Sequence, residues 1–313
     1  MGKLAFVFPG QGAQTVGMGK EFYEGYDLGK KLFDEADEAL GYSIRKLCFE
    51  GPAEELTLTA NTQPAILTVS VIAASLLRER GIMPEVAAGH SLGEYSALVL
   101  AGVLDFQDAV RLVHKRGAFM QEAVPVGEGA MAAVLGLERD KIVAVCEEIS
   151  RESPVQAVNF NCPGQTVIAG AKAGVEKATE ALSAAGAAKC VILPVSAPFH
   201  STLMAPAARK LAAELDKVEI RDAAFPVVSN YTGELESKAA EFKENLVKQA
   251  DHPVKWEDCV AAMVAFGATH FVEAGPGKTL CGFNKRIDRT LKNMNVENPV
   301  SLEKTLDTLK EVR

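Results

Sequence analysis

One serine lies between two glycines in the segment VAAGHSLGEYSAL, where Gly89, Ser91 and Gly93 give the pattern G-x-S-x-G. In a nucleophile elbow this pattern places a serine on a sharp turn between a buried strand and a helix, so that its hydroxyl can reach a substrate. The flanking residues fit, because the apolar Val86–Ala88 predicts a strand and GEYSALVLAG predicts a buried helix. The same residues also fit a helix capping box, with Ser91 as N-cap and Glu94 three residues later. The local sequence favours neither interpretation.

A nucleophilic serine needs a base to accept its proton. Of the five histidines, His200 is the favoured candidate, because it lies in SAPFHS, where an inserted domain is expected to return to the main lobe and loops carry function. The other four have structural explanations. His90 adjoins the serine, His114 lies on a charged helical stretch, His252 lies in a polar loop, and His270 begins a strand, where a buried, hydrogen-bonded histidine is usual. No acidic residue is clearly placed to orient His200.

The hydrophobic pattern predicts the elements that must position these side chains. An apolar run, Leu4–Phe8, predicts a buried strand, and helix and strand patterns alternate through both ends of the chain. Residues 126–196 differ, because they read strand, helix, strand, strand, helix, strand, which is the order of a ferredoxin-like domain. We therefore expect an α/β protein with a large lobe formed by residues 1–125 and 197–313, a small inserted domain at 126–196, and a substrate cleft between them.

Composition and charge limit the class of protein. The 313-residue chain has a formal net charge of −8, which argues against an extended nucleic-acid-binding surface because the phosphate backbone requires clustered cations. The longest apolar segment, Ala65–Leu77, is shorter than the roughly 20 residues of a membrane span and predicts a buried helix. The N-terminus has no signal-peptide core. The six cysteines are scattered without a C-x-x-C pair, which predicts reduced core thiols and no metal site. We expect a cytoplasmic protein.

Two glycine-rich stretches suggest nucleotide binding, but neither completes its motif. In GQGAQTVG, the third glycine of the dinucleotide fingerprint would fall at Thr15, and in GPGKT the first glycine of a P-loop would fall at Val272. Both stretches instead predict strand-to-helix loops whose backbone amides can approach an anion or a developing oxyanion.

Five motifs occur in a fixed order along the chain. They are FPGQGAQ (Phe8–Gln14), GHSLGEYSAL (Gly89–Leu98), NFNCPGQTVIAG (Asn159–Gly170), PFHS (Pro198–Ser201) and VEAGPGKTL (Val272–Leu280). Together they resemble the malonyl-CoA:acyl carrier protein transacylases and the related acyltransferase domains of polyketide and fatty acid synthases. The resemblance covers almost the whole chain. It implies an α/β-hydrolase-like large lobe with a parallel sheet and a ferredoxin-like insertion, in agreement with the division made above from the sequence pattern.

The resemblance also implies roles for the matched residues. Ser91 would carry the malonyl group as an ester, and His200 would act as its base. The backbone carbonyl of Gln249 would orient that histidine, which would explain why no acidic residue was found for this purpose. The backbone amides of Gln11 and Leu92 would form the oxyanion hole.

The implied substrates are malonyl-CoA and an acyl carrier protein. Arg116, in HKRGAFMQ, would hold the free carboxylate of the malonyl group, since a guanidinium can bind a carboxylate with two hydrogen bonds. The implied reaction is ping-pong transfer that supplies extender units for fatty acid synthesis, by a monomer without cofactor or metal. Carrier proteins of this kind are generally acidic, as is this chain, so docking requires a local basic surface. Lys285 and Arg286 are candidates for it, and Lys189 is another.

Two other functions compete with this interpretation. A serine esterase or thioesterase would share Ser91 and His200 but would need no carboxylate clamp, so Arg116 and the FPGQGAQ motif argue against it. A catalytically silent module that binds carrier proteins would need neither group, so the intact serine and histidine argue against that. The sequence does not distinguish the fatty acid pathway from the polyketide pathway.

Overall fold

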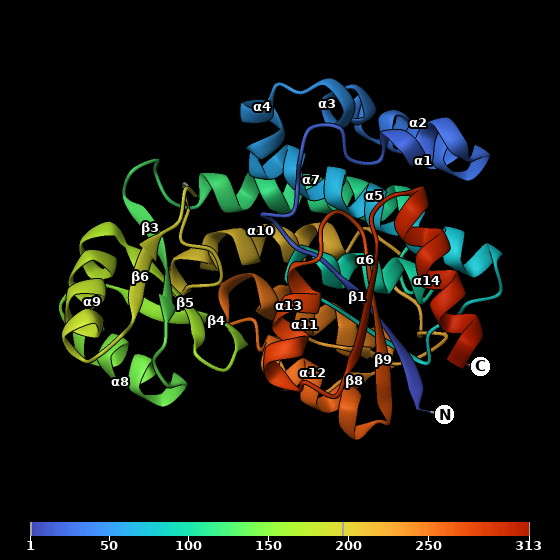
Figure 1. Cartoon of the computed structure of the whole chain (residues 1–313). Coiled ribbons are helices and arrows are strands. Elements are labelled where there is room, and N and C mark those ends of the chain that lie inside the picture. Colours follow the sequence, from blue (N-terminus) through green and yellow to red (C-terminus); the bar gives the residue numbers. More distant parts are fainter. Residues whose placement is uncertain (1, 196, 313) are drawn as a thin grey trace.

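Two β-sheets with separate sets of helices form the computed structural model, which describes residues 2–195 and 197–312 (Figure 1). The larger sheet has six strands, and all its pairings except that of its last two strands are parallel. In spatial order its strands are β10 (Lys292–Val296), β9 (Ala268–Ala274), β1 (Lys3–Phe8), β2 (Val86–Gly89), β7 (Val227–Val228) and β8 (Leu235–Glu236). The predicted α/β class with a parallel sheet is confirmed.

Strand β1 lies inside the larger sheet and is buried on both faces. Leu4, Phe6 and Phe8 pack into one apolar cluster, and Ala5 and Val7 pack into another. A continuous apolar run is the pattern expected of a parallel strand that is covered by helices on both sides. Helices that contribute to the first cluster include α5 (Thr59–Glu79), α6 (Leu92–Leu100), α7 (Phe106–Glu122), α10 (Ala205–Leu215), α11 (Ala239–Asp251) and α14 (Pro299–Val312). The second cluster includes α12 (Trp256–Ala265) and α13 (Thr279–Ile287).

Helix α5 is the longest helix of the large lobe. By length and composition alone it could cross a membrane, because the mean hydropathy of its most apolar stretch is 1.4. However, 89% of that stretch is buried inside the molecule. The prediction of a buried helix at Ala65–Leu77 is confirmed, and the helix extends beyond that segment at both ends.

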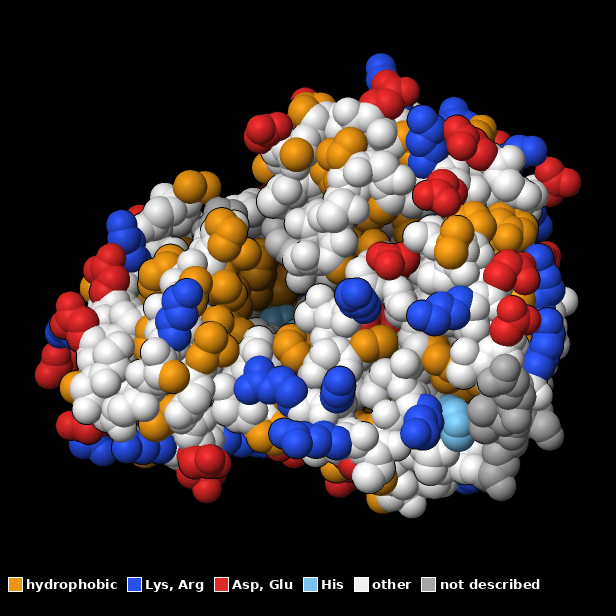
Figure 2. All heavy atoms as spheres, in the orientation of Figure 1, with side chains coloured by type: hydrophobic (Ala, Val, Ile, Leu, Met, Phe, Trp, Pro, Cys, Tyr) orange, Lys and Arg blue, Asp and Glu red, His pale blue; other side chains and the backbone are white. Residues whose placement is uncertain are grey.

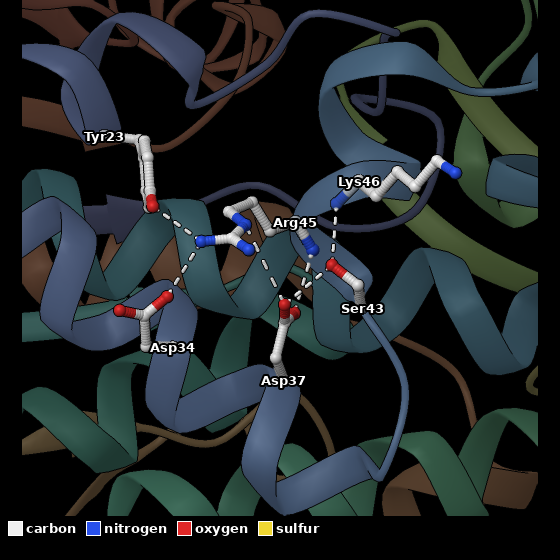
Figure 3. A network of polar contacts seen from close by, with 6 residues as sticks. All are labelled: Tyr23, Asp34, Asp37, Ser43, Arg45 and Lys46. Carbon is white, nitrogen blue, oxygen red and sulfur yellow. Dashed lines mark hydrogen bonds and ion pairs between the residues drawn. The ribbon is translucent and has the colours of Figure 1, made fainter.

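Short helices near the N-terminus form a cap over α5 (Figure 1). They are α1 (Lys20–Gly25), α2 (Asp27–Leu40), α3 (Ile44–Glu50) and α4 (Ala53–Thr57). A polar network joins α3 to α2 (Figure 3). Asp37 accepts hydrogen bonds from Ser43 Oγ at 2.7 Å and from the backbone N–H of Arg45 at 3.0 Å, while the Arg45 guanidinium donates to the Tyr23 hydroxyl. These contacts hold the first turn of α3 against α2, and so fix the cap.

The small sheet is antiparallel and belongs to a βαββαβ unit. Its elements are β3 (Gly129–Leu135), α8 (Arg139–Ser150), β4 (Val155–Cys162), β5 (Gln165–Ala171), α9 (Lys172–Ala184) and β6 (Lys189–Ile192). The strand order β4-β5-β3-β6 is that of a ferredoxin-like domain. Its predicted last residue, Ser196, lies outside the described residues, so the domain boundaries remain a prediction.

Strand β4 also joins the small domain to the large lobe. The backbone N–H of Phe160 donates to Val254 O at 2.9 Å, and the N–H of Val254 donates to Val158 O at 2.8 Å. Arg139 of α8 adds a contact to both carboxylate oxygens of Asp258, each at 3.2 Å. The segment after α11 is therefore hydrogen-bonded directly to the inserted domain.

The cysteines are free throughout the described residues, and their burial agrees only partly with the sequence prediction. Four are buried: Cys48, Cys146, Cys162 and Cys259. The expectation of core thiols is wrong for Cys190, on the edge strand β6, and for Cys281, in the first turn of α13, because both are partly exposed.

Candidate active site

Ser91 lies on the turn between β2 and α6, at the end of the parallel strand. Its backbone has φ 52° and ψ −105°, a left-handed conformation that costs energy for a non-glycine residue and clusters at functional sites. Its side chain makes no capping hydrogen bond to the helix, and its own N–H donates to Asn230 Oδ1 at 2.6 Å. The capping-box interpretation is therefore wrong, and the strand–turn–helix geometry is that of a nucleophile elbow.

The two glycines of G-x-S-x-G are required by close packing around this turn. A Cβ atom on Gly89 would lie 1.8 Å from the carbonyl carbon of Gly93, and one on Gly93 would lie 2.0 Å from the carbonyl oxygen of Phe8. Both distances are far below van der Waals contact. Only glycine lets α6 start this close to β1 and β2.

His200 lies within hydrogen-bond distance of the serine. The Ser91 Oγ to His200 Nε2 distance is 2.7 Å, and His200 Nδ1 lies 2.8 Å from the backbone oxygen of Gln249. A carbonyl only accepts, so Nδ1 carries the hydrogen and Nε2 presents a lone pair to the hydroxyl. Burial, followed by the positive charge of Arg116, lowers the pKa of His200 to about 3. The imidazole is therefore neutral near pH 7, as a base must be.

The remaining histidines have other hydrogen-bond partners. His90 Nε2 is 2.8 Å from Asn161 Oδ1 and so links the elbow to β4, while His114 and His252 bond to backbone carbonyls. The expectation that His270 is buried is wrong, because it lies near the start of β9, where the strand is partly exposed. Of the described histidines, only His200 is hydrogen-bonded to Ser91 Oγ.

Arg116 of α7 reaches the same hydroxyl from the opposite side. It is 1% exposed. Its Nη2 donates to Ser91 Oγ at 3.1 Å and to Gln249 Oε1 at 2.9 Å, and its Nη1 donates to Gln63 Oε1 at 2.8 Å. Its Nε is buried without a hydrogen-bond partner among the described residues. A buried guanidinium whose partners are all neutral is costly, and this arrangement is suited to binding an anion. Arg116 is therefore not a solvated surface charge.

Asn230 and Glu94 complete the floor of the site, and neither was predicted from the sequence to contribute to it. Gln249 Nε2 donates to the backbone oxygen of Ser91 at 2.9 Å and to Glu94 Oε2 at 2.9 Å. The backbone N–H of Asn230 also donates to Glu94 Oε2, at 2.9 Å. Burial raises the pKa of Glu94 to about 8. Asn230 carries no motif, so only the fold could reveal it, whereas Glu94 lies inside GHSLGEYSAL.

A cavity of about 280 Å³ lies between the two lobes in front of these residues. The large lobe contributes Gln11, Ser91 and His200 to its walls, and the small domain contributes apolar residues that include Met131 and Val167. Figure 2 shows the hollow between the lobes, with hydrophobic side chains on its small-domain side and histidine atoms at its floor. The cleft lies where the sequence predicted it.

The predicted oxyanion-hole residues flank the serine. Gln11 lines the cleft on the loop after β1, and Leu92 is the first residue of α6. Within the described residues, neither backbone N–H is paired with a protein acceptor. Amides at the start of a helix and in a glycine-rich loop are suited to bind a negatively charged oxygen.

The three predicted docking residues are exposed. Lys285 and Arg286 lie in the last turn of α13, and Lys189 begins β6. Arg286 also contacts the small domain, because its guanidinium donates to Gln165 Oε1 and to Pro163 O, each at 2.9 Å. This second contact was not predicted from the sequence.

An α/β lobe that holds a serine on an elbow against a neutral histidine is the arrangement of enzymes that transfer or hydrolyse acyl groups. This chain belongs to the acyl transferase family, because the family model described as "Acyl transferase domain" matches residues 5–309. The family predicted from the ordered motifs is thereby confirmed.

Individual relatives are similar over nearly their whole length. The malonyl CoA-acyl carrier protein transacylase of Bacillus subtilis (strain 168) is 51% identical over 312 residues, which cover 99% of this chain and 98% of that protein. A crystal structure of an acyl carrier protein S-malonyltransferase from Vibrio cholerae has a TM-score of 0.95 and 46% identity, covering 97% of this chain and 99% of that one. A malonyl-transacylase in complex with a type II PKS acyl-carrier protein has a TM-score of 0.95 and 45% identity, covering 98% and 99%.

Proposed function

We propose that this protein transfers the malonyl group of malonyl-CoA to the phosphopantetheine thiol of an acyl carrier protein, through an ester on Ser91, and so supplies extender units for fatty acid synthesis. One observation carries the proposal. The hydroxyl of Ser91 lies 2.7 Å from the base nitrogen of His200 and 3.1 Å from a guanidinium nitrogen of the buried Arg116. A nucleophile, a base and an unpaired cation thus meet at one atom, as transfer of an acidic acyl group requires.

The first half-reaction acylates the serine. His200 Nε2 accepts the hydroxyl proton of Ser91 as Oγ attacks the thioester carbonyl of malonyl-CoA, and the backbone oxygen of Gln249 stabilises the imidazolium through Nδ1–H. The oxyanion of the tetrahedral intermediate accepts hydrogen bonds from the N–H groups of Gln11 and Leu92, each worth about 3 kcal/mol. The carbon–sulfur bond then breaks, and His200 returns the proton to the sulfur of CoA.

The second half-reaction reverses these steps with a different thiol. The carrier's phosphopantetheine sulfur loses its proton to His200 and attacks the ester carbonyl of malonyl-Ser91. The intermediate collapses with cleavage of the bond to Oγ, which regains a proton from His200. No cofactor or metal takes part. The apolar small-domain wall of the cleft disfavours water, which would otherwise hydrolyse the ester.

Arg116 gives this site its preference for an acid. When the malonyl carboxylate binds, the buried guanidinium of Arg116 exchanges neutral hydrogen-bond partners for an anion. Hydrogen bonds between two charged groups are stronger than those to neutral acceptors. The carboxylate also offsets the positive charge that contributes to the low pKa of His200. Binding of the acidic acyl group therefore strengthens the base that activates Ser91.

Acylation of Ser91 is the direct test of this proposal. Brief incubation with malonyl-CoA is expected to add one malonyl unit to the protein, which peptide mapping places on the segment containing Ser91. Addition of holo carrier protein is expected to remove that unit and to add it to the carrier. Intact-mass measurement of both proteins follows the two steps.

The control for this experiment is Ser91→Ala, which is expected to remain unlabelled. Labelling that persists in this variant would disprove the serine ester. If water removed the malonyl group from Ser91 faster than the carrier protein did, the result would instead support the thioesterase alternative.

We infer that the carrier protein docks on a basic surface formed by Lys189, Lys285 and Arg286. Arg286 bonds to Gln165, Gln165 pairs with Leu135 across the small sheet, and Leu135 pairs with Lys189. Lys189 therefore lies two strands away from the strand that Arg286 contacts, and neighbouring strands are about 4.8 Å apart. Figure 2 shows Lys and Arg side chains gathered beside the hollow, where an acidic carrier could deliver its thiol.

Charge reversal at this surface is expected to impair only the second half-reaction. Changing Lys285 and Arg286 to Glu should raise the apparent KM for the carrier and flatten its salt dependence, with a smaller effect on acylation by malonyl-CoA. Lys285→Glu alone separates docking from the contact that Arg286 makes with the small domain. Lys304→Glu, on exposed α14, is the matched control. Equal losses in both half-reactions would indicate a CoA phosphate site or a folding defect and would overturn the docking assignment.

We further infer that the protein works as a cytoplasmic monomer, since one chain supplies the serine, the base, its orienting carbonyl and the arginine. Sedimentation of the purified protein at working concentration tests the monomer.

A further inference from the structure

Glu94 is a buried acidic side chain that neither the fold nor the proposed reaction explains. It lies in the first turn of α6 and is 1% exposed. Burial of a carboxylate is costly unless a cation or several hydrogen bonds compensate it. Within the described residues, the hydrogen-bond partners of the Glu94 side chain are the Gln249 amide and the backbone N–H of Asn230 rather than a cation. It does not cap α6 either, because the N–H of Ser91 is bonded to Asn230.

One hydrogen bond to Glu94 leads to the arginine and the histidine through Gln249. Gln249 Nε2 donates to Glu94 Oε2 at 2.9 Å, and the other end of the same amide, Oε1, accepts from Arg116 Nη2 at 2.9 Å. The backbone oxygen of Gln249 lies 2.8 Å from His200 Nδ1. The orientation of this amide is determined, because its nitrogen faces acceptors and its oxygen faces a guanidinium, which can only donate.

A second hydrogen bond to the same oxygen leads to the serine. The N–H of Asn230 donates to Glu94 Oε2 at 2.9 Å, and Asn230 Oδ1 accepts from the backbone N–H of Ser91 at 2.6 Å. Oε2 therefore holds two residues. One is Gln249, which contacts Arg116, and the other is Asn230, which contacts the backbone of Ser91. Because two N–H groups already occupy this oxygen, it remains an acceptor whether or not Glu94 is ionised.

We propose that Glu94 is a positioning residue: its Oε2 fixes the Gln249 amide, which in turn holds Arg116 in the orientation that selects acyl groups with a free carboxylate. The inference rests on the proposed function, because it assigns a role relative to the malonyl carboxylate. Without the acceptor at position 94, one N–H of Gln249 loses its partner in a buried site. The amide then rotates toward another acceptor, and Arg116 loses its fixed neighbour.

The test compares malonyl-CoA with acetyl-CoA in single-turnover acylation of Ser91, followed by intact mass. Glu94→Leu, which removes the acceptor at similar volume, is expected to lower the malonyl-to-acetyl preference by about tenfold, the loss that one buried hydrogen bond produces. Glu94→Gln keeps an acceptor oxygen and is expected to retain most of the preference. A merely structural role would lower both rates equally and leave their ratio unchanged.

The matched control is Glu236→Leu. Glu236 is also a buried carboxylate, 6% exposed, but it bonds to Thr232 and Asn245 instead of Gln249. Its replacement is expected to leave the ratio unchanged. Circular dichroism and melting temperature show whether Glu94→Leu folds. If it does not, Glu94→Asp replaces it, because this variant withdraws the carboxyl group by one methylene and is expected to lower the malonyl-to-acetyl preference in the same way.

Three outcomes would overturn the inference. The malonyl-to-acetyl ratio could stay unchanged in a folded Glu94→Leu or Glu94→Asp variant, or it could fall as much in Glu94→Gln or in Glu236→Leu as in Glu94→Leu. Failure of the proposed function would look different, because the wild-type protein would then not be malonylated or would show no preference for malonyl-CoA.

Discussion

Replacing His200 with alanine is expected to slow malonylation of Ser91 by about 10⁴-fold, the upper range for loss of a positioned general base. The hydroxyl would retain its contact with Arg116 but would have no group to accept its proton. The measurement is the rate of mass increase after mixing with malonyl-CoA. His114→Ala removes a partly buried histidine that bonds to the backbone of α5 and should leave the rate within about twofold.

The pH dependence of the wild-type rate is the second check on this role. His200 has a folded-state pKa of about 3, below the roughly 6.5 of an exposed histidine. The acylation rate should therefore show no titration of the base between about pH 8 and pH 5. The same shift reduces stability as the pH falls from about 6.5 toward 3, because the unfolded chain binds a proton that the folded protein does not. A rate that falls by half near pH 6.5, or equal rates in wild type and His200→Ala, would contradict the assignment.

Replacing Arg116 with alanine is expected to remove the preference for malonyl-CoA. Truncating one member of a buried charged pair costs about 2–5 kcal/mol, so malonyl transfer should fall by roughly 30- to 5,000-fold. Acetyl-CoA, which has no carboxylate for the guanidinium, should lose much less. The ratio of the two acylation rates is the measurement.

Arg111→Ala is the matched control for this variant. Arg111 lies on the same helix but is exposed and paired with Asp108 at 3.0 Å. Its loss should leave the ratio unchanged, since exposed ion pairs contribute little. A malonyl-to-acetyl ratio that survives in Arg116→Ala would remove this arginine from the substrate site.

The parts of the site that follow from local sequence could be predicted. The strand, turn and helix around Ser91 arise from contiguous residues, and so does the βαββαβ order of the small domain. The apolar run of β1 likewise indicates a strand buried on both faces. The pairing of Ser91 with His200 had only the position of a domain junction to support it until the family motifs were considered.

The remaining parts depend on contacts between residues that are distant in sequence. Asn230 reaches the N–H of Ser91 across 139 residues and Gln249 reaches its carbonyl across 158, and neither asparagine nor glutamine has a spacing that reveals such a partner. Local sequence was ambiguous at Glu94, where the capping box and the elbow share the same residues. The backbone conformation of Ser91 decides between them, and the fold sets that conformation.

The place of β1 in the larger sheet has a consequence for the order in which the protein folds during synthesis. One edge of β1 pairs with β2 at residues 86–89, but its other edge pairs with β9 at residues 268–274. At about 5–20 residues per second, the ribosome needs roughly 10–40 s to pass from one partner to the other. During that time the second edge of β1 has no strand to pair with, and the whole small domain is made and can fold before β9 appears. We therefore expect the active site to form only after the inserted domain has folded.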